Sequence, residues 1–130
     1  MAGLFGALPP MAAEDTKQQL PDTVVDIAHA QLQSGPFGEL RVHFEGATPQ
    51  ARAVTAGSAR LKPGMAPHPP HQHPEDEFLI VAEGTGEISI EERVTKVGPG
   101  DIAFCAGNKM HGIRNTGGGA MVFYFFKWRA

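Results

Sequence analysis

Short runs of alternating apolar and polar residues, separated by turns rich in glycine and proline, follow one another along most of the chain. In a β-strand this alternation turns one face toward a core and the other toward solvent. Many short strands at regular spacing predict an all-β protein, built as an antiparallel sandwich or barrel. One or two helical turns are expected at residues 12–19. Strands are expected at residues 23–31, 39–44, 52–61, 77–82, 87–91, 94–97, 102–105, 110–115 and 120–128.

The last expected strand is apolar on both faces. Val122, Tyr124, Phe126 and Trp128 share one of these faces, because residues two apart in a strand point the same way. A central strand covered on both sides is one explanation. A subunit interface is the other, since an exposed apolar patch of this size promotes aggregation. We expect the interface, and therefore a homodimer.

The size and charge of the chain restrict its function. Its 130 residues allow one domain, which we place at residues 21–130 after an N-terminal arm at 1–20. A net charge of -3 and a pI near 6.0 argue against nucleic-acid or anionic-membrane partners, because no basic stripe exists to neutralise phosphates. No apolar run is long enough to span a bilayer. The single cysteine, Cys105, excludes an intrachain disulfide, and we expect an inert core residue rather than a thiolate ligand.

The N-terminal segment MAGLFGALPPMAAED is apolar up to the small residues that precede an acidic stretch. This pattern resembles the end of a secretory signal, but it lacks a start rich in Lys and Arg, and two prolines interrupt it. Two interpretations stay open. Residues 1–13 are either part of an arm on a cytoplasmic protein, which we expect, or the end of a truncated export signal on a periplasmic or exported protein.

Four potential metal ligands stand out: His71, His73 and Glu77 in PHPPHQHPEDEF, and His111 in NKMHGIRN. In a strand, His71 and His73 project to the same side, and Glu77 shares their parity. A polar turn rich in His and Pro would explain a lone His-x-His pair, but not the glutamate at this offset or the second segment with a histidine. Imidazole nitrogens and a carboxylate oxygen suit one divalent transition-metal ion: Fe, Mn, Ni, Cu or Zn.

These segments also resemble the two motifs of the cupin superfamily. HQHPEDEFLIVAEG is similar to the first motif, with Gly84 six residues beyond the glutamate, and GDIAFCAGNKMHGIRN is similar to the second, in which Gly100 and Asn115 match. Ala106 and Asn108 replace the usual proline and glycine. Asn108 is a mild departure, because asparagine tolerates a positive φ better than other residues with a side chain.

The resemblance implies a double-stranded β-helix, or jelly-roll barrel, with the three histidines and Glu77 around one metal ion. It also implies that Glu77 is either a ligand or a base that leaves the metal. The ligand set resembles that of small quercetin-dioxygenase-like cupins, which implies a non-haem dioxygenase acting on a small organic substrate. A redox-neutral isomerase, epimerase, cyclase, lyase or decarboxylase is the alternative, and a non-catalytic module that binds a small molecule is the next.

Other polar residues have weaker claims to a role in the site. His68 is a candidate proton shuttle or hydrogen-bond donor at the mouth, although a solvated residue is the more common case. His43 is expected to be a structural histidine with its hydrogen bonds satisfied, and His29 a surface residue. Asn115 is expected to tie down the loop after His111 through its amide. Three arginines are expected to point outward rather than into the barrel: Arg41, Arg52 and Arg60.

Overall fold

The structure is a computed structural model that describes residues 18–130 of the chain. The predictions for residues 1–13, and nearly all of the helical turns expected at 12–19, lie outside the described residues. Within residues 18–130 there is no helix, and so none with the length and apolar character needed to cross a membrane.

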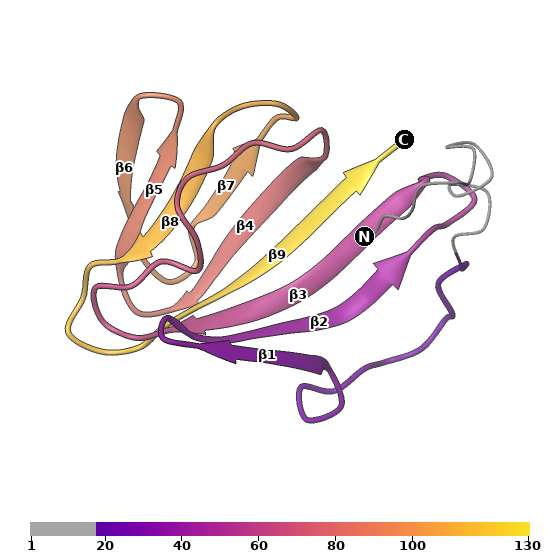
Figure 1. Cartoon of the computed structure of the whole chain (residues 1–130), viewed down its shortest axis with the longest axis horizontal. Helices are drawn as coiled ribbons and strands as arrows, with labels where there is room; N and C mark the ends of the chain where they lie inside the picture. The colour runs from indigo at the N-terminus through magenta and orange to yellow at the C-terminus, as the bar shows by residue number, and fades with distance from the viewer. Residues whose placement is uncertain (1–17) are drawn as a thin grey trace.

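The described residues contain nine strands, all paired antiparallel, which form two sheets that face each other (Figure 1). The larger sheet has the order β1-β2-β3-β9-β4-β7, and the smaller has the order β6-β5-β8. This is an antiparallel all-β arrangement, as the strand spacing predicts, and it has the jelly-roll form that the motif resemblance implies. The strands are β1 (Gln31–Gly35), β2 (Gly38–Gly46), β3 (Ala53–Leu61), β4 (Asp76–Glu83), β5 (Gly86–Ile90), β6 (Arg93–Val97), β7 (Ile102–Cys105), β8 (His111–Asn115) and β9 (Met121–Arg129).

The core lies between the two sheets and is built from alternate residues of the central strands. On β4, Leu79 and Val81 are buried, and they face Ile88 of β5 and Ile113 of β8 in the same cluster. Burying an aliphatic side chain of this size contributes about 1.5–3 kcal/mol relative to leaving it exposed. On β9, Phe123 points inward. The residues of opposite parity, which were predicted to form the apolar face, therefore point outward: Val122, Tyr124, Phe126 and Trp128.

One predicted strand is wrong. Residues 23–31 form no strand except at the last position, and Val24 and Ile27 are 89% and 52% exposed. The SGPFG segment forms a tight turn that pairs Gly35 with Gly38. That tight turn places residues 31–35 opposite 38–42, so the strand beside β2 is the segment next to the turn rather than the more apolar one before it.

The connection between β3 and β4 runs along the free edge of β8 (Figure 1). Asn115 N donates to Met65 O (2.9 Å) at one end, and His71 pairs with His111 in an isolated antiparallel bridge at the other. Between these points the segment contains three prolines, which have no N–H to donate to a strand ladder. Pro70 instead packs on Gly112, where an added Cβ would lie 3.2 Å from the proline ring.

Candidate metal centre

Three imidazoles meet at one end of the barrel. His71 and His73 come from the connection before β4, and His111 is the first residue of β8. The ring centroids lie 5.0 Å apart for His71–His73, 5.0 Å for His71–His111 and 4.8 Å for His73–His111. One ligand nitrogen from each ring lies within 4.8 Å of the others. The structure therefore brings together the three histidines that the sequence singled out.

The backbone fixes this convergence in a way that differs from the prediction. His71 and His73 do not lie on one strand, because β4 begins only at Asp76. His71 is placed by its bridge to His111, and His73 by Asn108 N, which donates to His73 O (2.7 Å). Asn108 has a φ of 64°, the left-handed conformation expected at this motif position. The two histidines thus project together because two separate contacts hold a loop, not because of strand parity.

The far nitrogen of two rings is oriented by a main-chain carbonyl. His111 Nδ1 lies 2.9 Å from Lys109 O, and His73 Nδ1 lies 3.1 Å from Glu75 O. A carbonyl oxygen only accepts, so Nδ1–H donates and Nε2 keeps its lone pair when each ring is neutral. Both Nε2 atoms then face the centre of the cluster, as metal ligands do.

Glu77 completes the group from β4. Its side chain is buried, and its Oε1 lies 3.0 Å from His111 Nε2 and 3.2 Å from His73 Nε2. Ligand atoms that bind one ion at about 2.0–2.2 Å and at right angles lie about 3 Å from one another. The two spacings fit that geometry for Glu77, His73 and His111, while the group whose ligand atoms all lie within 4.8 Å of one another contains the three histidines alone.

The electrostatics of the site favour neutral His71 and ionised Glu77. Burial, followed by the charge of His68, lowers the pKa of His71 to about 4. Burial by itself raises the pKa of Glu77, but the hydrogen bond from His111 and nearby positive charges outweigh it and leave that pKa below its usual value. The same hydrogen bond raises the pKa of His111. A neutral imidazole and an ionised carboxylate are the forms that bind metal ions.

A cavity of about 410 Å³ opens onto the four side chains. Its deeper wall is apolar and includes Leu79, Phe123 and Phe125. Its remaining wall carries polar side chains that the sequence did not single out. The parity of β9 was a signal for one of them, because Lys127 has the same parity as the inward Phe123 and Phe125. These polar residues are Gln31, Gln33, Glu45, Thr55 and Lys127.

His68 lies beside the site without joining the cluster of three. Its ring centroid is 3.9 Å from that of His71, and the planes are tilted by 32°. Its Nδ1 lies 2.9 Å from Pro69 O, and the residue is exposed at the mouth of the cavity. This position agrees with a residue at the mouth, while its part in catalysis stays a prediction.

Asn115 ties down its loop as expected. It is fully buried, its Nδ2 donates to Leu61 O (3.0 Å) and Gly119 O (2.8 Å), and its Oδ1 accepts from Gly117 N (2.9 Å).

Cys105 is also fully buried within the core cluster, and burial raises its thiol pKa to about 11. The core position expected for Cys105 is therefore confirmed, and its inertness stays a prediction.

The remaining candidates lie away from the metal centre. His29 is exposed beside Asp26. Arg41 pairs with Glu39 on the outer face of β2 (2.8 Å). The prediction for His43 is wrong, because its Nδ1 is buried with no hydrogen-bond partner among residues 18–130. His43 lies where a bulge shifts the register between β2 and β3.

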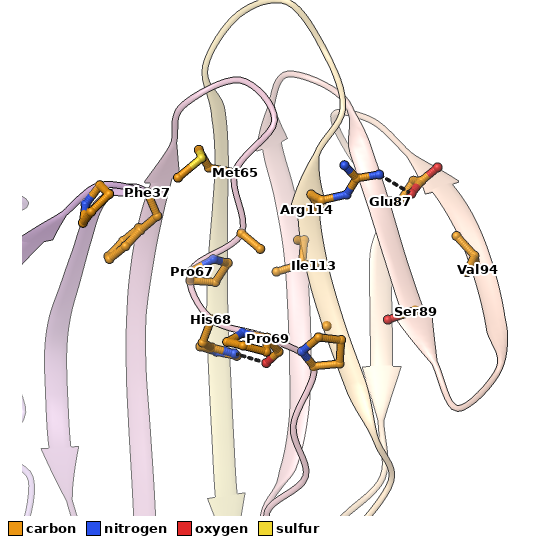
Figure 2. Close-up of a pocket in the computed structure, with 14 residues that line it drawn as sticks. Phe37, Met65, Pro67, His68, Pro69, Glu87, Ser89, Val94, Ile113 and Arg114 are labelled. Carbon is orange, nitrogen blue, oxygen red and sulfur yellow. Dashed lines mark hydrogen bonds and ion pairs between the residues drawn. The ribbon is translucent and has the colours of Figure 1, made fainter.

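A second cavity, of about 620 Å³, is larger but does not contain the three clustered histidines. It lies over the face of the small sheet that is turned away from the core, beside the proline-rich connection between β3 and β4 (Figure 2). Arg114 and Glu87 face each other there at 3.4 Å, and Val94 lies beyond them. His68 is the one histidine that lines both cavities. The smaller cavity therefore contains the candidate metal ligands, and volume alone does not identify the candidate site.

Residues 57–127, more than half of the chain, match the family described as Cupin domain. The chain belongs to the cupin family. Solved cupin structures share its fold at low sequence identity. An RmlC-like cupin from Shewanella frigidimarina is 14% identical with a TM-score of 0.70, over 87% of this chain and 96% of that one. No curated protein matches the chain.

Two further solved structures carry functional names. KdgF from a Halomonas species is 21% identical with a TM-score of 0.68, over 85% of this cupin and 96% of that chain. A predicted oxalate decarboxylase from Thermotoga maritima is 20% identical with a TM-score of 0.66, over 83% of this cupin and all of that chain. At these identities the likeness establishes the shared fold and leaves the reaction open.

Proposed function

We propose that this cupin is a metal-dependent enzyme that acts on a small organic substrate in the cavity of about 410 Å³. One divalent transition-metal ion would be held by His71, His73, Glu77 and His111. The observation that carries the proposal is the spacing of about 3 Å between Glu77 Oε1 and two imidazole Nε2 atoms, which is the spacing of ligands around one ion.

Non-haem dioxygenase chemistry is the first candidate. Histidines and a carboxylate that leave coordination positions open are the donor set of non-haem iron oxygenases. When bound, such an ion supplies Lewis acidity toward substrate oxygens, or one-electron chemistry toward O₂. The chain's own contribution is to hold the imidazoles through their main-chain contacts, and to keep water from the reacting centre with Leu79, Phe123 and Phe125.

A redox-neutral reaction is the second candidate, and the surroundings of Glu77 favour it. Both histidine Nε2 atoms lie against Oε1, at 3.2 and 3.0 Å, and no hydrogen bond to Oε2 is formed within the described part of the chain. Because Glu77 is held ionised, Oε2 is able to accept a proton from a substrate carbon or hydroxyl group. Proton transfer of this kind serves an isomerase, cyclase, lyase or decarboxylase, and one cupin of similar fold is named a predicted oxalate decarboxylase.

Metal content and oxygen dependence separate the candidates. Protein should be purified without added metal and without a metal-binding tag, and its metals measured by mass spectrometry. About one equivalent of Fe or Cu, with oxygen consumption that depends on an added substrate, supports the dioxygenase. About one equivalent of Zn, Mn or Ni, with turnover that persists without oxygen, supports the redox-neutral enzyme. Metal binding without turnover on a broad panel supports a non-catalytic binding module, and failure to bind any of these metals overturns the proposal.

A further inference from the structure

A row of polar residues crosses the larger sheet at the level of the metal centre. Glu45 of β2 pairs in register with Thr55 of β3. Thr55 in turn pairs with Lys127 of β9, and Lys127 pairs with Glu77 of β4. Register partners on neighbouring strands point to the same face of a sheet. All four line the cavity, so the cavity wall beside the metal ligands contains one lysine.

Lys127 lies in this row without a direct ion-pair partner among residues 18–130. It is partly buried, and its ammonium forms no ion pair with a carboxylate in the described chain. The nearest carboxylate along the row, that of Glu77, has its Oε1 against the Nε2 atoms of His73 and His111. A charge that leaves water costs free energy unless an opposite charge or hydrogen-bond acceptors compensate it. Within residues 18–130 this charge interacts with Glu77 through space, and no direct ion pair compensates it.

Metal binding alone gives no reason for a lysine here. The positive charge of Lys127 is close enough to Glu77 and His111 to influence the pKa of each. Like charges repel, so this ammonium weakens the binding of a cation at the same ligands. An anion that contacts both the metal ion and the lysine reverses that effect, because each positive charge then stabilises the ligand.

We propose that Lys127 binds the carboxylate of the substrate, and that this cupin acts on small carboxylic acids that carry an apolar group. The inference rests on the proposed function, because the second positive charge in the cavity is the bound metal ion. The apolar wall sets the other half of the specificity. It is formed by Leu40, Val42, Leu79, Ile113, Phe123 and Phe125.

The polar row gives the carboxylate a defined place. Thr55 lies next to Lys127 in the register, and its hydroxyl is a second donor for the same oxygen atoms. Glu45 is exposed beyond Thr55 at the rim, where its negative charge disfavours anions that stay at the entrance. A carboxylate is therefore drawn inward to the level at which Glu77 and the histidines meet, and the rest of the substrate lies against the phenylalanines.

Calorimetric titration with malonate tests the proposal. Malonate is small enough to enter and offers one carboxylate to the metal ion and one to the lysine; malonamide has the same shape without charge. The protein is loaded with one equivalent of zinc. We expect malonate to bind and malonamide to bind far more weakly. Lys127→Met should weaken malonate binding roughly ten- to hundred-fold, the effect of losing a hydrogen bond to a charged group. Lys127→Arg should restore most of the affinity.

Controls separate this inference from the proposed function. Lys96→Met removes a lysine on the exposed strand β6 and should leave malonate binding unchanged. Zinc affinity measured on Lys127→Met should be equal to or higher than that of the wild type, which also shows that the variant is folded. If the wild type binds no metal, the proposed function fails. If zinc binds, but malonate does not bind or binds Lys127→Met as tightly as the wild type, the carboxylate inference alone is overturned.

Discussion

His71 and His111 are joined through their backbones rather than through their side chains. His71 N donates to His111 O at 2.9 Å, and His111 N donates to His71 O at 2.8 Å, as an isolated bridge between the β3–β4 connection and β8. Main-chain hydrogen bonds do not depend on the side chain. The bridge therefore places two imidazoles at the metal centre and should survive the loss of either one.

Because this bridge uses only main-chain atoms, each histidine side chain can be replaced singly without breaking the bridge. We expect His71→Ala to lose stoichiometric metal binding while its far-ultraviolet circular dichroism stays that of the wild type. His68→Ala is the matched variant, because its ring lies 3.9 Å from that of His71 but outside the cluster of three. It should keep one metal ion per chain. Full metal binding by His71→Ala, measured by mass spectrometry after dialysis, would contradict the ligand assignment.

Metal removal should destabilise the folded chain. A ligand that binds only the folded state at 100 times its dissociation constant adds about 2.7 kcal/mol to the free energy of unfolding. For a chain of this length that corresponds to roughly 10 °C in the melting temperature. Calorimetry before and after verified chelation should show the shift, and His71→Ala should show none. A wild-type melt that chelation leaves unchanged counts against the site.

Asn115→Ala should be strongly destabilising. The side chain is fully buried and makes three hydrogen bonds, to Leu61, Gly119 and Gly117. Its loss leaves buried carbonyl and amide groups without partners, at a cost of about 3 kcal/mol or more. Urea unfolding measures the change. The neighbouring Thr116→Ala is the control, because Thr116 is exposed and donates only through its backbone, to Thr85 O. Equal effects of the two substitutions would refute the role of the amide.

Cys105 should resist thiol reagents in the folded protein. Burial raises its thiol pKa from 9.0 to about 11, which lowers the thiolate fraction at pH 8 roughly a hundred-fold. The thiol is also fully buried, which lowers the rate further. Reaction with a chromogenic disulfide at pH 8 should be more than a hundred-fold slower than in guanidinium-unfolded protein. Similar rates in both states would mean that the thiol is accessible and ionised.

We propose that the outer face of the larger sheet is a homodimer interface. Tyr124 and Phe126 are 42% and 38% exposed on β9, and Phe104 of β7 is 49% exposed. Trp128 stacks on Phe126 and on Phe78, so the apolar surface continues across three neighbouring strands. A contiguous apolar surface of this kind on one sheet face is typical of a subunit contact.

Sedimentation velocity tests the interface. The wild type should sediment as a dimer at micromolar concentration. Phe126→Lys should shift it to the monomer, because a dimer would bury the new charge, while Arg114→Lys on the opposite sheet should not. A wild-type monomer at these concentrations excludes the dimer. A dimer that Phe126→Lys leaves intact would place the contact on another surface.

Local pattern was enough to predict most strands, because each inward face is marked by residues close together in sequence. On β4 the alternation that buries Leu79 and Val81 is visible without a structure, and so is the alternation on β9. The strand at 23–31 failed because alternation says which face is apolar, not which neighbour is present. The turn at Gly35–Gly38 decided the neighbour of β2.

The sequence by itself determined the fold class and singled out the three histidines that could hold a metal ion, because side-chain type and short-range spacing carry both. Only the tertiary structure decided how the ligands are held and what lies beside them. His71 and His73 lie on a loop fixed by contacts with β8 and Asn108, and Lys127 reaches the metal centre through the pairing of β9 with β4. Both depend on contacts between segments far apart in the chain, which form only when burial of the shared core aligns the strands.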